Sequence, residues 1–200
     1  MSNIKLTIHT ATYNRAHTLP QAYKSLQSQT CFDFEWLITD DGSTDGTKDL
    51  VESWQGEENQ FTIRYVQLQH GGLIRALNYA MSVAQGDYYF RLDSDDAMLP
   101  NAVETIVGKF NDINDKPDYV GVGFVIVSPA GEPLKGIWPN VNEQGFVDCT
   151  NLERCKYNLD ADMREAYKLD IIKKYPFPVW KDELFAPEQL QMDAMALDGY

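Results

Sequence analysis

Three carboxylates stand within four residues at Asp93-Ser94-Asp95-Asp96, directly after the hydrophobic run 87–92. Carboxylates this close repel one another unless a cation or solvent screens them. At the end of a strand, Asp93 and Asp95 can point the same way and bind Mg²⁺ or Mn²⁺. Such a metal neutralises a diphosphate and stabilises it as a leaving group. The simpler alternative is a solvated acidic turn that caps the next helix.

Two other polar segments also follow hydrophobic runs. Asp40-Asp41-Gly42-Ser43 is an acidic pair followed by a glycine that permits a tight turn. A carboxylate there can accept a hydrogen bond from a base N–H or a ribose hydroxyl, although a plain turn with a helix cap has the same composition. The segment 10–15 carries small and amide-bearing side chains that suit the lining of a nucleotide.

The elements that must position these segments alternate along the chain. Hydrophobic periodicity predicts strands at 4–10, 34–39, 61–68, 87–92 and 119–127, and helices at 19–29, 48–54, 73–84, 102–110 and from about 187. This alternation indicates a mostly parallel sheet flanked by helices. Ligands of such sheets bind beyond the carboxyl ends of the strands, where all three polar segments fall. After about residue 131 we expect irregular structure, because Pro, Gly and Trp become frequent.

Composition restricts the possible partners. The chain has 200 residues, 44% hydrophobic and 24% charged, which is typical of one soluble domain. Its net charge of -13, from 17 basic and 30 acidic residues, argues against a nucleic-acid partner. A phosphorylated ligand would then require a cation as a screen. Three cysteines without CxxC spacing and the lack of a signal peptide or an apolar span predict a cytoplasmic protein.

The polar motifs together resemble those of family 2 glycosyltransferases of the GT-A fold. The motifs are 10–15, Asp40 to Asp45, Gly71-Gly72 with Arg75 to Asn78, and Gly86-Asp87-Tyr88 leading to Asp93-Ser94-Asp95-Asp96. The resemblance is firm over about residues 4–100, and later segments at 173–178 and 185–188 look like the acceptor side of bacterial members. It implies an α/β, Rossmann-like GT-A sheet and one catalytic domain over 1–200, with a nucleotide-sugar half at 1–100 and an acceptor-side half at 101–200.

The resemblance also implies nucleotide contacts. Thr10, Ala11 and Tyr13 would line the nucleotide, and Asp41 would hydrogen-bond a uracil-like base. The donor is therefore expected to be a UDP-sugar, and the acceptor a sugar or a lipid-linked glycan. A place in the cytoplasm, with peripheral association at the inner face of the membrane, follows from the same resemblance, as does the expectation that the chain ends within the acceptor-side region.

The resemblance to the family further implies contacts with the metal and with the sugar donor. Arg75 and Asn78 would face the donor, Asp93 would lie near the ribose and the metal, and Asp95 would be the principal ligand of Mn²⁺ or Mg²⁺. Asp96 would flank this site.

An inverting transfer needs one base to take the proton of the acceptor hydroxyl. The family places this base on the acceptor side, where Glu188 is our candidate and Asp193 and Glu183 are the reserves. A glutamate at a helix N-terminus also has a purely structural explanation, because it complements the helix dipole.

Two other classes fit the sequence less well. A sugar nucleotidyltransferase would need a Gly-rich basic loop after the first strand, and a dehydrogenase would need GxGxxG there, whereas 10–15 contains no glycine. A nucleotide-binding module of the same fold without turnover is the remaining alternative. The sequence does not specify an oligomeric state.

Overall fold

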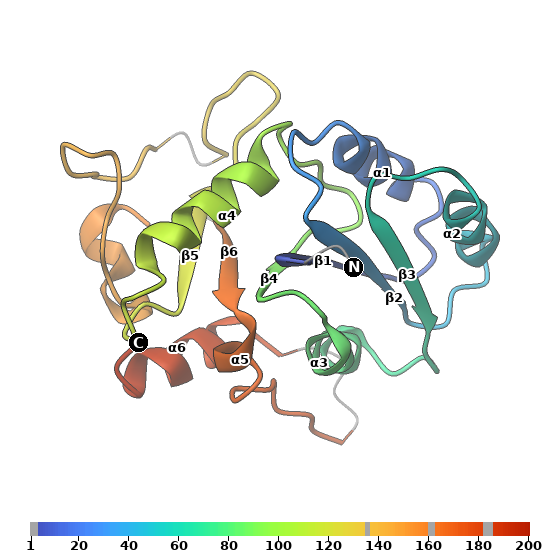
Figure 1. Cartoon of the computed structure of the whole chain (residues 1–200). Coiled ribbons are helices and arrows are strands. Elements are labelled where there is room, and N and C mark those ends of the chain that lie inside the picture. The colour runs from blue at the N-terminus through green and yellow to red at the C-terminus, as the bar shows by residue number, and fades with distance from the viewer. Residues whose placement is uncertain (1–3, 135–136, 160–162, 182–185) are drawn as a thin grey trace.

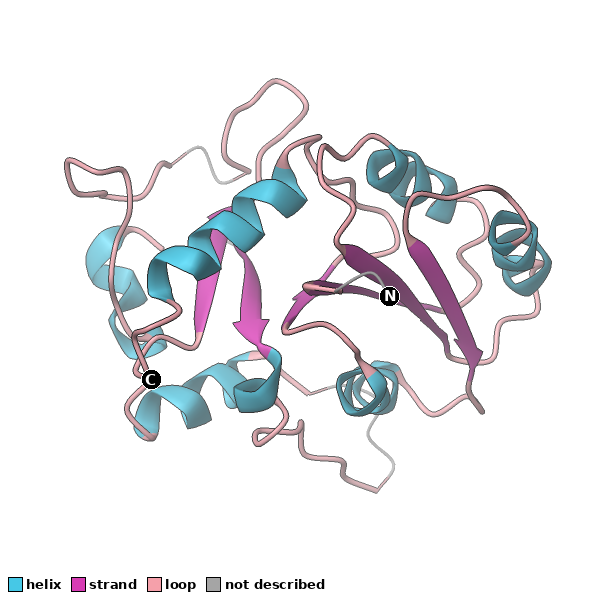
Figure 2. Cartoon of the chain, in the orientation of Figure 1, coloured by secondary structure: helices cyan, strands magenta, loops and turns pink. Residues whose placement is uncertain are grey.

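One sheet with helices on both faces forms the molecule (Figures 1 and 2). The computed structural model describes residues 4–134, 137–159, 163–181 and 186–200. Its strands are β1 (Leu6–Thr12), β2 (Phe34–Asp40), β3 (Thr62–Gln67), β4 (Tyr88–Arg91), β5 (Gly121–Val125) and β6 (Met163–Lys168). Its helices are α1 (Leu19–Gln27), α2 (Thr47–Gln55), α3 (Leu73–Val83), α4 (Ala102–Ile113), α5 (Leu169–Ile172) and α6 (Gln189–Leu197), with a 3₁₀ helix η1 (Asn151–Tyr157).

The six strands lie in the order β3-β2-β1-β4-β6-β5. β1 is parallel to β2 and β4, and β2 is parallel to β3, whereas β6 runs antiparallel to β4 and β5. The predicted α/β class and its mostly parallel sheet are therefore confirmed. The carboxyl ends of β1, β2 and β4 meet at one edge of the sheet.

The second half is more ordered than we expected, because it contributes η1, β6 and α5. β6 has the sequence MREAYK, in which charged residues interrupt the hydrophobic alternation that marks a strand. It forms because it fills the position between β4 and β5, where Ala166 is completely buried.

The two faces of the sheet carry separate cores. Residues of α1, α2 and α4 pack on the face formed by side chains such as Ile8, Trp36 and Phe90. Residues of α3 and α5 pack on the opposite face, against Leu37 and Tyr89. Within the described ranges, no helix combines the length and the apolar character needed to cross a membrane.

A buried carboxylate ties the strands together near their amino ends. Glu35 is completely buried and accepts hydrogen bonds from Thr7 Oγ1 at 2.6 Å and from the backbone N–H of Gln85 at 2.7 Å. Arg64 Nη1 lies 2.7 Å from its other oxygen. A buried charge needs such partners. The network joins β1, β2, β3 and the turn after α3. It lies at the opposite end of these strands from the three polar segments.

Candidate active site

The three polar segments that the sequence places after β1, β2 and β4 do meet. The N–H of Asn14 donates to Ser43 Oγ at 2.8 Å, and the N–H of Thr44 donates to Asn14 Oδ1 at 2.8 Å. Arg15 Nη1 lies 3.7 Å from Asp95 Oδ2, which joins the first segment to the acidic loop. Asn14 has a φ of 53°, a left-handed conformation that asparagine tolerates.

The residues expected to line a nucleotide differ in exposure. Thr10 is completely buried, and its hydroxyl accepts a hydrogen bond from Trp36 Nε1 at 3.0 Å, so its side chain faces the core. Ala11 is partly buried. Tyr13 is 46% exposed, and its ring stacks on His70 at 4.5 Å. Of these three residues, Tyr13 has an exposed side chain, whereas the side chain of Thr10 is fully enclosed.

Asp41 is held by the turn that begins α3. Its carboxylate accepts hydrogen bonds from the N–H groups of Gly71 at 2.8 Å and Gly72 at 2.9 Å. His70 Nδ1 lies 2.8 Å from the same group, and Asp41 as a whole is 5% exposed. Gly72 has φ 89° and ψ 162°, a conformation open to glycine almost alone. We expected this carboxylate to face a base, and with two backbone N–H donors already bound it keeps acceptor positions for that purpose.

The two α3 residues expected at the donor behave differently from each other. Arg75 is exposed and folds back over Gly71, where a Cβ would lie 2.7 Å from Arg75 Cδ. No acidic side chain among the described residues pairs with it. The amide of Asn78 is instead used by Phe177: Asn78 Nδ2 donates to its carbonyl, and its N–H donates to Asn78 Oδ1, both at 2.9 Å. Asn78 therefore anchors a distant segment, which the sequence did not indicate.

The acidic loop after β4 is held by two arginines that the sequence analysis missed. Arg91 Nε lies 3.2 Å from Asp93 Oδ1, and Arg164 Nη2 pairs with Asp93 Oδ2. Arg164 also lies 3.1 Å from Asp96 Oδ2. Arg91 stands two residues before Asp93, so a cation at the end of the predicted strand was a usable signal. Arg164 comes from β6, and no local pattern places it there.

The carboxylates suit a cation that also binds a ligand. The side chain of Asp95 is 56% exposed, and its ion pair with Arg15 is long, whereas Asp93 is already paired with two arginines. Among the described residues, no three acidic, histidine or cysteine groups lie together so that they could hold a metal. Mg²⁺ typically uses one or two carboxylates and completes its shell with phosphate oxygens and water. The donor set fits a cation shared with a diphosphate.

The candidate bases lie in different surroundings. Glu188 immediately precedes α6, and its Oε1 lies 2.5 Å from Arg91 Nη2, so one guanidinium joins it to Asp93. Asp193 Oδ1 instead accepts from Asn151 Nδ2 at 2.7 Å and from Gln189 Nε2 at 2.8 Å, which ties it to η1. Glu183 lies outside the described residues.

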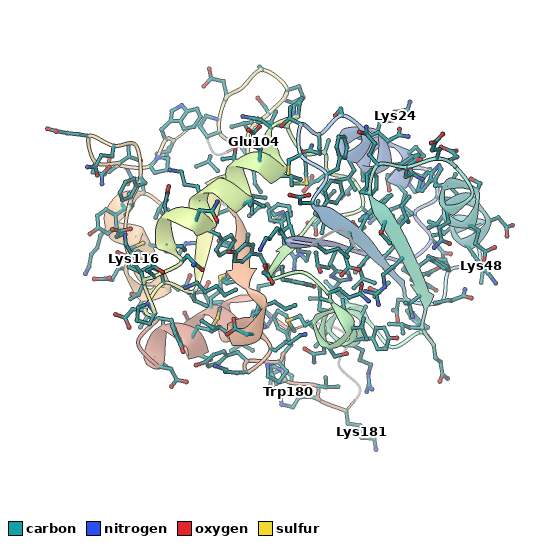
Figure 3. The ribbon with its side chains drawn as sticks, viewed as in Figure 1. Lys24, Lys48, Glu104, Lys116, Trp180 and Lys181 are labelled. Carbon is teal, nitrogen blue, oxygen red and sulfur yellow. The ribbon has the colours of Figure 1, made fainter. Side chains whose placement is uncertain are left out.

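Trp180, in the segment between α5 and α6, is 46% exposed, and Lys24, Lys48 and Lys116 are spread over separate parts of the surface (Figure 3).

Comparison with known proteins gives a consistent result. The family model described as Glycosyl transferase family 2 matches residues 7–160. An uncharacterized glycosyltransferase of Rickettsia conorii is 32% identical over 129 residues, which is 64% of this chain and 21% of that protein. The chain thus spans about a fifth of that relative.

Two solved structures share the fold. S. aureus TarS 1–349 in complex with UDP-GlcNAc aligns with a TM-score of 0.63 and 23% identity, over 87% of this chain and 48% of that one. The mannosyltransferase PcManGT of Pyrobaculum calidifontis, in complex with GDP-Man and Mn²⁺, aligns with a TM-score of 0.68 and 19% identity, over 98% of this chain and 53% of that one. The expected GT-A sheet is confirmed by these likenesses.

Proposed function

The chain belongs to glycosyl transferase family 2, and from this we propose that it transfers a sugar from a nucleotide-diphosphate donor to a hydroxyl acceptor in glycan synthesis. The observation that carries the proposal is the meeting of the segments after β1, β2 and β4 at one edge of the sheet. Tyr13, Asp41 and Asp95 come from these three segments, and all lie within the residues that the family model matches.

The donor is a UDP-sugar in this proposal. Tyr13 offers an exposed ring on which a base can stack, and the Asp41 carboxylate keeps acceptor positions for a base N–H. Arg75 is an exposed guanidinium close to the glycine turn and suits a phosphate group. The structural neighbours were solved with UDP-GlcNAc in one case and GDP-Man in the other, so the titration below compares both nucleotides.

Asp95, with Asp93 beside it, would hold Mn²⁺ or Mg²⁺, and the bound cation would neutralise charge on the departing diphosphate. The exposure of Asp95 supports its role as the principal ligand. Arg91 and Arg164 fix Asp93 from both sides, so that its carboxylate keeps one orientation.

The transfer inverts the anomeric centre, with Glu188 as the base. Its carboxylate takes the proton from the acceptor hydroxyl while the new glycosidic bond forms and the bond to the diphosphate breaks. Its connection through Arg91 to Asp93 favours it over Asp193. The acceptor in this proposal is a sugar or a lipid-linked glycan at the inner face of the membrane.

Calorimetric titration of UDP, GDP and dTDP, with and without Mn²⁺, tests this proposal. We expect one nucleotide to bind in a manganese-dependent manner and Asp95→Ala to weaken that binding by about 10–100-fold, because a principal cation ligand is lost. Asp115→Ala is the matched control, since Asp115 is exposed after α4 and far from the motifs in sequence. Binding that does not need Mn²⁺ would remove the metal from the proposal, and no binding of any nucleotide would contradict the transferase function.

A further inference from the structure

Arg91 is a partly buried cation placed between two functional parts of the molecule. It is the last residue of β4, and its side chain is 17% exposed. Strand alternation puts it on the same face as Tyr89, toward α3 and α5. There it lines a cavity together with Glu188, Met81 and Met192.

The guanidinium bridges carboxylates from two elements that are remote in sequence. Its Nη2 lies 2.5 Å from Glu188 Oε1, and its Nε lies 3.2 Å from Asp93 Oδ1. No other side chain in the described part of the chain pairs with the Glu188 carboxylate. A guanidinium carries its charge in one rigid plane, so it fixes the relative position of two carboxylates better than a flexible ammonium does; Arg91 Nε meets Asp93 at ion-pair distance and not in hydrogen-bond geometry.

We infer that Arg91 is a positioning residue, which sets the candidate base Glu188 at a fixed place relative to the acidic loop. This inference rests on the proposed function. A partly exposed ion pair contributes little net stability, since desolvation and screening by water offset the attraction between the charges. Both carboxylates remain more than a third exposed, so either can be hydrated when Arg91 is replaced. Arg91 therefore matters for geometry rather than for folding.

Arg164 provides a matched comparison. It pairs with Asp93 and Asp96 from the neighbouring strand β6, and its side chain is 23% exposed, but it makes no ion pair with Glu188. Replacement of Arg164 thus disturbs the acidic loop in a similar way and leaves the partner of Glu188 in place.

The experiment measures kcat and KM for release of the nucleoside diphosphate. The single variants are Arg91→Met, Arg91→Lys, Arg164→Met and Glu188→Gln. Two double variants combine Glu188→Gln with Arg91→Met or with Arg164→Met. We expect Arg91→Met to lower kcat by about 100-fold, the usual effect of a displaced catalytic group, with a change in KM below about threefold. Arg91→Lys should recover part of this loss. In the Glu188→Gln background, Arg91→Met should cost only about the factor that Arg164→Met costs, because its effect through the base is already lost while its effect on the acidic loop remains. Arg164→Met should cost the same factor in both backgrounds.

Equal losses from Arg91→Met with and without Glu188 would overturn the inference, as would a loss explained by a lower unfolding temperature of the variant. If the wild type binds no nucleotide or turns over no donor, the proposed function fails by itself. The inference is then judged from the carboxyl carbon resonance of Glu188 in ¹³C-glutamate-labelled protein, assigned with Glu188→Gln. That resonance should move in Arg91→Met and stay in Arg164→Met, and the opposite pattern would refute the contact.

Discussion

Acidic side chains at the carboxyl edge of the sheet differ in what they already bind. Asp41 accepts from two backbone N–H groups, and Asp93 is paired with two arginines. Asp95 has one long ion pair with the exposed Arg15. A metal ion therefore meets the least competition from arginines and backbone donors at Asp95, so Asp95→Ala is the substitution that tests the metal site.

The two described candidates for the base can be separated by a matched pair of substitutions. Glu188→Gln should reduce kcat by about 10²–10⁴-fold and leave nucleotide affinity unchanged, because the amide cannot accept the proton from the acceptor hydroxyl. Asp193→Asn should change kcat by less than about threefold, since its carboxylate is bonded to Asn151 of η1 and to Gln189. Steady-state turnover and calorimetry measure both quantities. The reverse order of effects would assign the base to Asp193.

At the scale of elements, the segment after α5 is attached to α3 by hydrogen bonds from Asn78 as well as by packing in a shared core. Asn78 forms two hydrogen bonds with the backbone of Phe177, which is itself 6% exposed. This attachment brings the chain back toward the site before Glu188 and α6. The two hydrogen bonds join residues 99 positions apart and order a segment that we propose to lie on the acceptor side.

Asn78→Ala tests the importance of this attachment. It should lower the free energy of unfolding by about 1–3 kcal/mol, because two hydrogen bonds are lost and partly buried backbone groups lose their partners. The amide hydrogen of Phe177 should exchange faster with solvent. Asn111→Ala is the control, since Asn111 is exposed on α4. Urea unfolding and hydrogen exchange provide the measurements, and an unchanged exchange rate at Phe177 would show that the segment is held by other contacts.

For the molecule as a whole, stability should depend on pH through a buried histidine. His9 on β1 is completely buried, with Nε2 2.8 Å from Thr39 Oγ1 and Nδ1 2.5 Å from Tyr89 Oη. Burial, and secondarily the charge of Arg91, lowers the pKa of His9 to about 3. Between that value and the ordinary pKa of about 6.5, the unfolded chain binds a proton that the folded chain does not, so stability falls as pH falls.

The expected size of this effect follows from linkage. Between about pH 7 and about pH 5, His9 should account for a loss of about 2 kcal/mol in the free energy of unfolding. His9→Gln should remove this part of the pH dependence, whereas His17→Gln should keep it, because His17 is exposed. Urea unfolding of the three proteins at both pH values tests the prediction. An equal pH dependence in wild type and His9→Gln would show that other groups cause it.

Local patterns in the sequence were sufficient for the first half of the fold. Alternation of strands and helices up to about residue 113 depends on periodicity and turn residues that lie close together in the chain, so the expected elements and the meeting of the three polar segments were predicted correctly. The acidic loop was identified in the same way, because its residues are neighbours.

Only the tertiary structure decided which partners these residues have. The insertion of β6 between β4 and β5 brings Arg164 to Asp93, and the return of the chain brings Glu188 to Arg91. It also directs Thr10 into the core and Asn78 to Phe177. These contacts join residues that are far apart in sequence, and their free energy depends on burial and on pairing across the sheet, which no local pattern of residues encodes.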